Sequence, residues 1–118
     1  AVACAYHDSL LLSEDAAYRI SEGFGGGMGH YGHTCGACSA MVMVAGSQIS
    51  KGIEDMSSKQ QTYPIVKEMV EQFVEANGYL NCFDILRNGS QDMEDNKRVC
   101  CIHCIHSACD ILDHMLKK

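Results

Sequence analysis

The stretch that decides the fold is CGACSAMVMVAGS, residues 35–47, because it is apolar or small on every side. A helix without a polar face is buried all round, so this segment is expected to lie at the centre of the fold. Met41 and Met43 are interpreted as core residues, since methionine commonly fills irregular gaps. Its small residues would let neighbouring helices come close: Gly36, Ala37, Ala40 and Gly46.

The rest of the chain predicts further helices around this one. Its 118 residues suit a single domain, residues 1–118, with a modest core. Apolar residues recur on one face of residues 62–77, where Pro64 fits the first turn and Gly78 fits the stop. The other expected helices are residues 1–12, residues 14–22 with Ser13 as N-cap, a short helix near Cys82, and residues 95–116. We therefore predict an all-α fold, a compact bundle of about five helices.

A glycine-rich loop leads into the central helix. Residues 23–38 read GFGGGMGHYGHTCGAC and hold seven of the chain's eleven glycines. Successive backbone N–H groups in such a turn form an anion-binding nest, so the predicted cofactor-binding residues are Gly25, Gly26, Gly27 and Gly29. Nucleotide phosphate is disfavoured. GMGHYG matches G-x-G-x-x-G, but no βαβ unit surrounds it and the chain has no G-x-x-x-x-G-K-[ST] loop.

Charge and hydropathy exclude several classes of partner. A net charge of -6, with nine Lys plus Arg spread along the sequence, argues against nucleic acid and an anionic membrane surface. No apolar run approaches the roughly 20 residues of a membrane span, so we expect a soluble protein without membrane insertion. Because the sequence opens AVACAY without methionine, its N-terminus can have been trimmed. We expect a cytoplasmic protein, with export left open.

Eight cysteines allow three kinds of chemistry: disulfides, a metal site or redox thiols. A disulfide scaffold is disfavoured because the composition is that of a core-forming helical chain. Cys35 and Cys38 form a C-x-x-C pair at a helix start, where backbone amides and the helix dipole favour thiolates. This pair predicts thiol redox chemistry, although no βαβ unit of the thioredoxin type accompanies it. Together with Cys101 and Cys104, it also allows a zinc site.

The last helix sorts its four cysteines by face when it is laid out at about 100° per residue. The stripe expected to face the core is Ile102, Ile105, Cys109, Leu112 and Leu116. Cys109 lies in the middle of that stripe and is interpreted as a buried hydrophobic residue. Cys101 lies at its edge, Cys104 a little farther round and Cys100 near the polar side. Cys101 is therefore the best placed of the four to reach a site at the rim of the core.

Several short motifs follow one another along the chain: CAxxxxLL from Cys4, GFGGGMG followed closely by TCGA, NC at Cys82, and a late cysteine followed by AxxIL at Ala108. In this combination the sequence resembles the redox-active protein family named for its C…GCAxxG…C…C pattern. These are small helical proteins that also occur as a domain of split-Soret cytochromes. The resemblance implies that the family cysteines are Cys4, Cys35, Cys82 and Cys101. Ala40 stands at the motif's final glycine, and the additional cysteines are Cys38, Cys100, Cys104 and Cys109.

The resemblance implies a redox role, and our leading hypothesis is an iron–sulfur cluster used in electron transfer. Its expected ligands are Cys4, Cys35, Cys82 and Cys101, with Cys38 and Cys104 less favoured. Such a protein would work with an electron-transfer partner protein or as a homodimer. Two alternatives stay open: a metal-free thiol/disulfide oxidoreductase, in which Cys35 attacks and Cys38 or another family cysteine resolves, and a structural or trafficking zinc protein. Whether the protein is an enzyme is left open.

Overall fold

The computed structural model describes residues 1–89 and 94–116. Its α-helices are α1 (Val2–Ala5), α2 (Glu14–Ser21), α3 (Gly25–Met28), α4 (Gly36–Ile49), α5 (Lys59–Asn77), α6 (Cys82–Gly89) and α7 (Glu94–Met115). Two short 3₁₀ helices, η1 (Glu22–Phe24) and η2 (Ile53–Ser58), precede α3 and α5. Within the described residues, β structure is limited to one isolated bridge between Thr34 and Asn81. The predicted all-α fold is confirmed.

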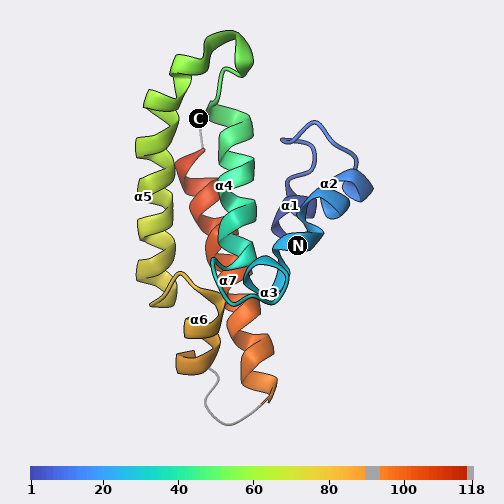
Figure 1. The fold of residues 1–118 in the computed structure, drawn as a ribbon, viewed down its shortest axis with the longest axis vertical. Helices are drawn as coiled ribbons and strands as arrows, with labels where there is room; N and C mark the ends of the chain where they lie inside the picture. Colours follow the sequence, from blue (N-terminus) through green and yellow to red (C-terminus); the bar gives the residue numbers. More distant parts are fainter. Residues whose placement is uncertain (90–93, 117–118) are drawn as a thin grey trace.

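Three long helices form the body of the molecule. α4, α5 and α7 pack against one another in all three pairs, and Figure 1 shows them side by side along the long axis. Full burial of a large apolar side chain contributes about 1.5–3 kcal/mol, so their shared core supplies much of the driving force for folding. Its fully buried side chains are Met41 and Val44 of α4, Met69 and Phe73 of α5, and Ala108 and Leu112 of α7.

α4 is the central helix that the sequence predicts. It spans Gly36–Ile49 and contacts α1, α5 and α7. Met41 is fully buried, which confirms its interpretation as a core residue, whereas Met43 is half-buried at the edge of the core. Because helices pack on several sides of α4, its small residues allow the close approach that a helix without a polar face requires.

The N-terminal segment is less helical than predicted. α1 ends at Ala5, and residues 6–12 form turns, so the expected helix over residues 1–12 is wrong. His7 Nδ1 lies 3.0 Å from the Leu12 carbonyl oxygen, and Leu11 adopts a left-handed backbone with φ 58°. Local side-chain contacts of this kind compete with helical hydrogen bonds. The predicted N-cap of α2 is confirmed, since Ser13 Oγ accepts a hydrogen bond from the Ala16 N–H at 3.1 Å.

α5 begins earlier than predicted. The helix starts at Lys59 rather than Thr62, and η2 occupies much of the expected linker over residues 50–62. Pro64 consequently lies inside the helix instead of in its first turn. Proline has no N–H, so the Gln60 carbonyl loses its helical partner, and the exposure of Gln60 leaves that oxygen open to water. Gly78 ends α5 with φ 85°, as predicted.

α7 turns a partly different face to the core from the predicted one: Leu112 is buried as predicted, and Ile105 and Leu116 pack against the core. The buried residues are Cys104, Ala108, Ile111 and Leu112, whereas Ile102 is 44% exposed. Cys109 is only half-buried, so its predicted position in the middle of the core is wrong. Apolar residues occur on several faces of α7, and packing against both α4 and α5 therefore decides its rotation. This rotation moves Cys104, rather than Cys109, into the core.

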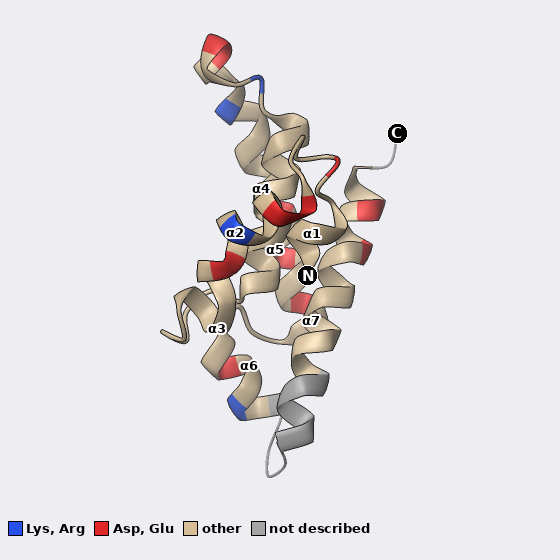
Figure 2. Ribbon diagram, turned by 90° about the vertical axis from the view of Figure 1, so that its right-hand side faces the viewer, with Lys and Arg blue, Asp and Glu red and all other residues tan. Residues whose placement is uncertain are grey.

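Acidic residues are prominent among the charges on the surface. Figure 2 shows Asp and Glu spread over α2, α6 and α7, with few Lys and Arg on the face drawn. In the part of the chain that the structure describes, no helix combines the length and apolarity needed to cross a membrane.

Candidate functional site

The glycine-rich loop is a compact coil closed by its own hydrogen bonds. The Gly29 N–H donates to the Gly23 carbonyl at 2.8 Å, and the His33 N–H donates to the Gly27 carbonyl at 3.1 Å. The N–H groups of residues 30–32 also donate to carbonyls within the loop. The amides of residues 29–33 are therefore engaged inside the coil rather than turned toward an anion.

The coil is joined to the start of α6. The Cys82 N–H donates to the His33 carbonyl at 2.6 Å, and the Cys35 N–H donates to the Leu80 carbonyl at 2.9 Å. The Thr34–Asn81 bridge lies between these bonds. Because Cys35 is the N-cap of α4 and Cys82 is the first residue of α6, this junction brings both cysteines to the same end of the bundle (Figure 1).

Gly27 allows the coil to lie directly against this junction. Its backbone is left-handed, with φ 73°, and it is buried. A Cβ atom at this position would lie 2.5 Å from the His33 carbonyl oxygen and 2.8 Å from Cys82 Cβ. Both neighbours are fixed by the hydrogen bond between them, so neither can move away cheaply. The glycine therefore sets the distance between the loop and Cys82.

A cavity of about 430 Å³ lies beside the junction and is lined by four cysteines: Cys35 of α4, Cys82 of α6, and Cys101 and Cys104 of α7. Its other walls are mostly apolar and include Val2, Phe24 and Phe83. A volume of this size falls within the range of about 300–1,000 Å³ that is typical of small-molecule sites. The cavity therefore combines thiols with space for a ligand.

Only some of the predicted site residues line the cavity. Three of the four family cysteines, Cys35, Cys82 and Cys101, line the cavity together. Of the predicted glycines, Gly25 and Gly26 line it, whereas Gly27 lies beneath the junction and Gly29 is exposed. Cys38 is 1% exposed and belongs to the core instead.

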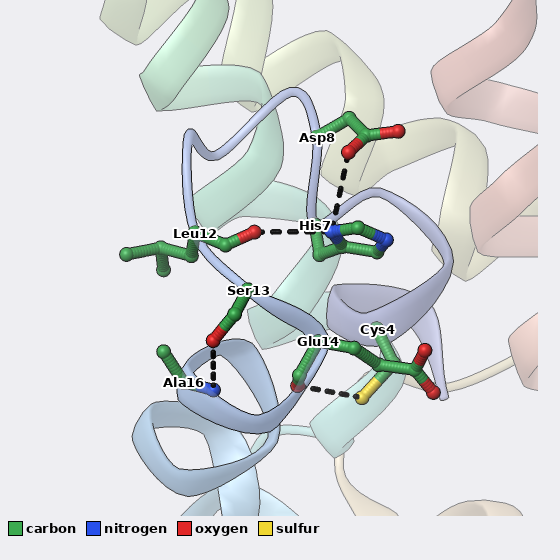
Figure 3. Close-up of polar contacts among 7 residues, drawn as sticks. All are labelled: Cys4, His7, Asp8, Leu12, Ser13, Glu14 and Ala16. Atoms are coloured by element: carbon green, nitrogen blue, oxygen red, sulfur yellow. Dashed lines mark hydrogen bonds and ion pairs between the residues drawn. The ribbon is translucent and has the colours of Figure 1, made fainter.

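Cys4 is the family cysteine that the cavity does not include. Residues 1–3 line the cavity, but the Cys4 thiol points to the Glu14 carbonyl oxygen at the start of α2, at 3.8 Å (Figure 3). The same close-up shows His7 held between Asp8 and the Leu12 carbonyl. Cys4 therefore links α1 to α2, and its predicted role as a ligand stays a prediction.

Cys35 carries the thiolate of the site. A hydrogen bond from the Cys104 thiol is the largest influence and lowers the pKa of Cys35, against the opposing effect of burial. The backbone N–H groups of Ala37 and Cys38 act in the same direction, as expected at a helix N-terminus. The resulting pKa is about 6, so Cys35 is largely a thiolate at pH 7.

The neighbouring thiols stay protonated because of burial and of the charge on Cys35. The hydrogen bond to Cys35 raises the pKa of Cys104, and burial adds to it. Burial, followed by the charge of Cys35, raises the pKa of Cys38 to about 12 and also raises the pKa values of Cys82 and Cys101. The site thus holds one thiolate among neutral thiols.

Cys104 is the cavity residue whose position helix-face reasoning did not predict. It is 2% exposed overall, yet it lines the cavity and contacts Cys35. The sequence contained one signal, the C-x-x-C spacing of Cys101 and Cys104, but this spacing does not reveal a contact with Cys35.

Among the described residues, no group of three or more His, Cys, Asp or Glu side chains is placed to hold a single metal ion.

The fold and the site define a small all-α protein with a cysteine-lined cavity at the N-terminus of its central helix. The sequence matches, over residues 1–115, the family described as "Putative redox-active protein (C_GCAxxG_C_C)". The chain belongs to this family, and its membership supports a redox role. No curated protein and no solved structure matches the chain.

We expect Gly27→Ala to destabilise the protein more than Gly29→Ala. Both positions have left-handed backbones, so alanine costs about 1–2 kcal/mol at each. At Gly29 nothing lies within 4 Å of the added Cβ, whereas at Gly27 it collides with His33 and Cys82 and costs about 1–3 kcal/mol more. Urea unfolding of both variants measures the difference. Equal losses would show that the close contact does not matter.

The reactivity of Cys35 with iodoacetamide is expected to rise with pH and reach half its maximum near pH 6, because only the thiolate reacts. In Cys104→Ala the hydrogen bond is absent, so the pKa of Cys35 and the midpoint move up toward the ordinary 9.0. Mass spectrometry of the labelled Cys35 peptide measures each profile. Cys109→Ala is the matched control on α7 and leaves the midpoint unchanged; an unchanged midpoint in Cys104→Ala would contradict the assignment.

Proposed function

We propose that the protein is a thiol/disulfide redox protein in which Cys35 and Cys104 cycle between a dithiol and a disulfide. The observation that carries this proposal is that Cys35 and Cys104 line the same cavity, where the Cys104 thiol lowers the pKa of Cys35. The low pKa of Cys35 supports its role as the nucleophile, since the attacking species is a thiolate. The family's redox character is consistent with this chemistry.

The cycle follows ordinary thiol/disulfide exchange. The Cys35 thiolate attacks one sulfur of a disulfide substrate in the cavity, and the other substrate sulfur leaves as a thiolate. Cys104 then loses its proton to that thiolate and attacks Cys35 Sγ. This step forms the Cys35–Cys104 disulfide and releases the second substrate sulfur as a thiolate, which takes a proton from water, so that the substrate leaves as two thiols, reduced by two electrons. An external dithiol restores the protein.

Cys104 is favoured over Cys38 as the resolving residue. Cys38 is the partner that a C-x-x-C motif suggests, but it is buried in the core and does not line the cavity. Cys38 acts on Cys35 through its backbone N–H, whereas Cys104 acts through its thiol, which donates a hydrogen bond to the Cys35 sulfur. Resolution by Cys104 therefore requires the smaller movement.

We expect glutathione disulfide to convert the reduced protein into a form with one Cys35–Cys104 disulfide. Peptide mapping after acid quenching identifies the linked pair, and Cys104→Ser abolishes it. Cys38→Ser and Cys82→Ser retain it, because neither residue takes part in the exchange. A disulfide between Cys35 and Cys38 in the wild-type protein would overturn the assignment of Cys104.

A second candidate is an iron–sulfur cluster, favoured by the four cysteines that line one cavity. Cluster binding commonly uses four thiolates, and Cys35, Cys82, Cys101 and Cys104 are those that would hold it. A cluster spreads its irons over several positions, so its thiolates need not converge on one ion, unlike the ligands of zinc. When bound, it would supply one-electron transfer to a partner protein, with a homodimer as one possible arrangement.

Cys82→Ser separates the two candidates. Under the cluster proposal, anaerobically purified wild-type protein is coloured and contains iron and sulfide, and Cys82→Ser loses both. Under the thiol proposal, both proteins are colourless and both form the Cys35–Cys104 disulfide. Visible spectroscopy with iron and sulfide analysis decides between these outcomes. Zinc near one per chain, with no redox change, would instead favour a structural or trafficking role.

A further inference from the structure

The cavity beside Cys35 is lined by aromatic side chains from three different elements. Tyr18 belongs to α2, Phe24 to η1 and Phe83 to α6. Tyr18 and Phe83 are 55% and 50% exposed, and Phe24 is half-buried. Aromatic side chains offer a large apolar surface and pack favourably against other rings. Because these residues keep exposed surface at the cavity, that surface is available to a ligand.

The glycine coil fixes the position of Phe83. A Cβ atom at Gly32 would collide with three atoms of the Phe83 ring, so the ring packs directly on this glycine. Gly32 has a left-handed backbone, with φ 80°, and its carbonyl accepts a hydrogen bond from the Phe83 N–H at 3.3 Å. The coil thus holds one side of the ring, while half of the residue stays exposed.

A second glycine brings η1 to the cavity. A Cβ atom at Gly36 would lie 2.8 Å from the Phe24 carbonyl oxygen, so η1 packs against the first turn of α4, next to Cys35. Two residues of η1, Glu22 and Phe24, line the cavity. Glu22 is the acidic residue of the lining, and the described lining residues include no Lys or Arg. The space beside Cys35 is therefore apolar and aromatic, with one negative charge.

We propose that the substrate of this cavity is a low-molecular-weight disulfide that carries an aromatic group beside its sulfur atoms and no carboxylate. This inference rests on the proposed thiol/disulfide function and names its substrate class. The aromatic group packs against Phe83 within the cavity that Cys35 lines. The Cys35 thiolate bonds to one substrate sulfur, the substrate S–S bond breaks, and the other sulfur leaves as a thiolate. Cys104 then resolves the mixed disulfide as described above.

Charge disfavours an anionic substrate at this cavity. A carboxylate on the substrate would meet no Lys or Arg among the described lining residues and would be repelled by Glu22. The net charge of -6 acts in the same direction. Glutathione disulfide carries carboxylates and no aromatic group. It is therefore expected to react with Cys35, but more slowly than an uncharged aromatic disulfide.

The test compares the rates at which three disulfides consume unmodified Cys35, measured by mass spectrometry after acid quenching. The reagents are dithiodipyridine, which is aromatic and uncharged, dithiobis(nitrobenzoate), which is aromatic and anionic, and hydroxyethyl disulfide, which is uncharged and not aromatic. Each rate is divided by that of mercaptoethanol with the same reagent, which removes differences between leaving groups. We expect the normalised rate of dithiodipyridine to exceed that of hydroxyethyl disulfide about tenfold. It should exceed that of dithiobis(nitrobenzoate) about threefold at low ionic strength.

Substitutions at the cavity identify the residues that cause these preferences. Phe83→Ala removes most of the preference for the aromatic group, and Phe83→Leu, which keeps apolar bulk, removes only part of it. Tyr63→Ala, at an exposed aromatic residue of α5 that does not line the cavity, is the matched control and retains the preference. Glu22→Gln removes most of the discrimination against dithiobis(nitrobenzoate), whereas Glu54→Gln in η2 retains it.

The outcomes separate the substrate class from the function on which it rests. Equal normalised rates, or a preference that survives Phe83→Ala, overturn the aromatic substrate, although the Cys35–Cys104 disulfide still forms with each reagent. A faster normalised reaction with insulin, whose disulfides belong to a polypeptide, overturns the assignment of a low-molecular-weight substrate. Absence of the Cys35–Cys104 disulfide with every reagent overturns the proposed function itself, and the substrate class with it.

Discussion

The hydrogen-bonded junction between the glycine coil and the start of α6 is the constraint on which the site depends. It ties residues 32–35 to residues 80–83, segments that lie far apart in the chain. Buried backbone groups must find partners, so the junction fixes the coil, the N-terminus of α4 and the N-terminus of α6 as one unit. Gly27 fits only because it has no side chain. Close packing therefore accounts for part of the glycine density around Cys35, since an added Cβ would meet close neighbours at Gly26, Gly27, Gly32 and Gly36 but not at Gly23, Gly25 or Gly29.

Within this unit, electrostatics limits the site to one thiolate. The charge on Cys35 is among the causes that raise the pKa values of Cys38, Cys82, Cys101 and Cys104. A second negative charge nearby would cost Coulomb energy in a partly buried space. Two chemical events remove that cost: disulfide formation, which consumes the thiolate, and the binding of a cationic metal centre. The same four thiols are thus compatible with both candidate functions.

The sequence predicted the elements whose signals are local. α4 follows from its uniform apolarity, the N-cap of α2 from Ser13, and the end of α5 from Gly78. The rotation of α7 about its own axis has no local signal in the sequence. Its apolar residues occupy several faces, and only packing against α4 and α5 selects the one that faces the core. The contact between Cys35 and Cys104 depends on that rotation. It was therefore beyond the reach of helix-face reasoning. Of the four cysteines that were expected to converge, Cys35, Cys82 and Cys101 line one cavity and Cys4 does not.

The position of Cys4 bears on the choice between the two chemistries. Val2 and Ala3 of α1 are buried in the core and line the cavity, whereas the Cys4 thiol points to the Glu14 carbonyl oxygen. A turn of α1 by about one residue, or 100°, would bring Cys4 toward the cavity but would also move Val2. Exposing a buried valine costs about 1.5–3 kcal/mol. A cluster that used Cys4 would have to offset this loss through its own binding, whereas exchange between Cys35 and Cys104 requires no rearrangement of α1.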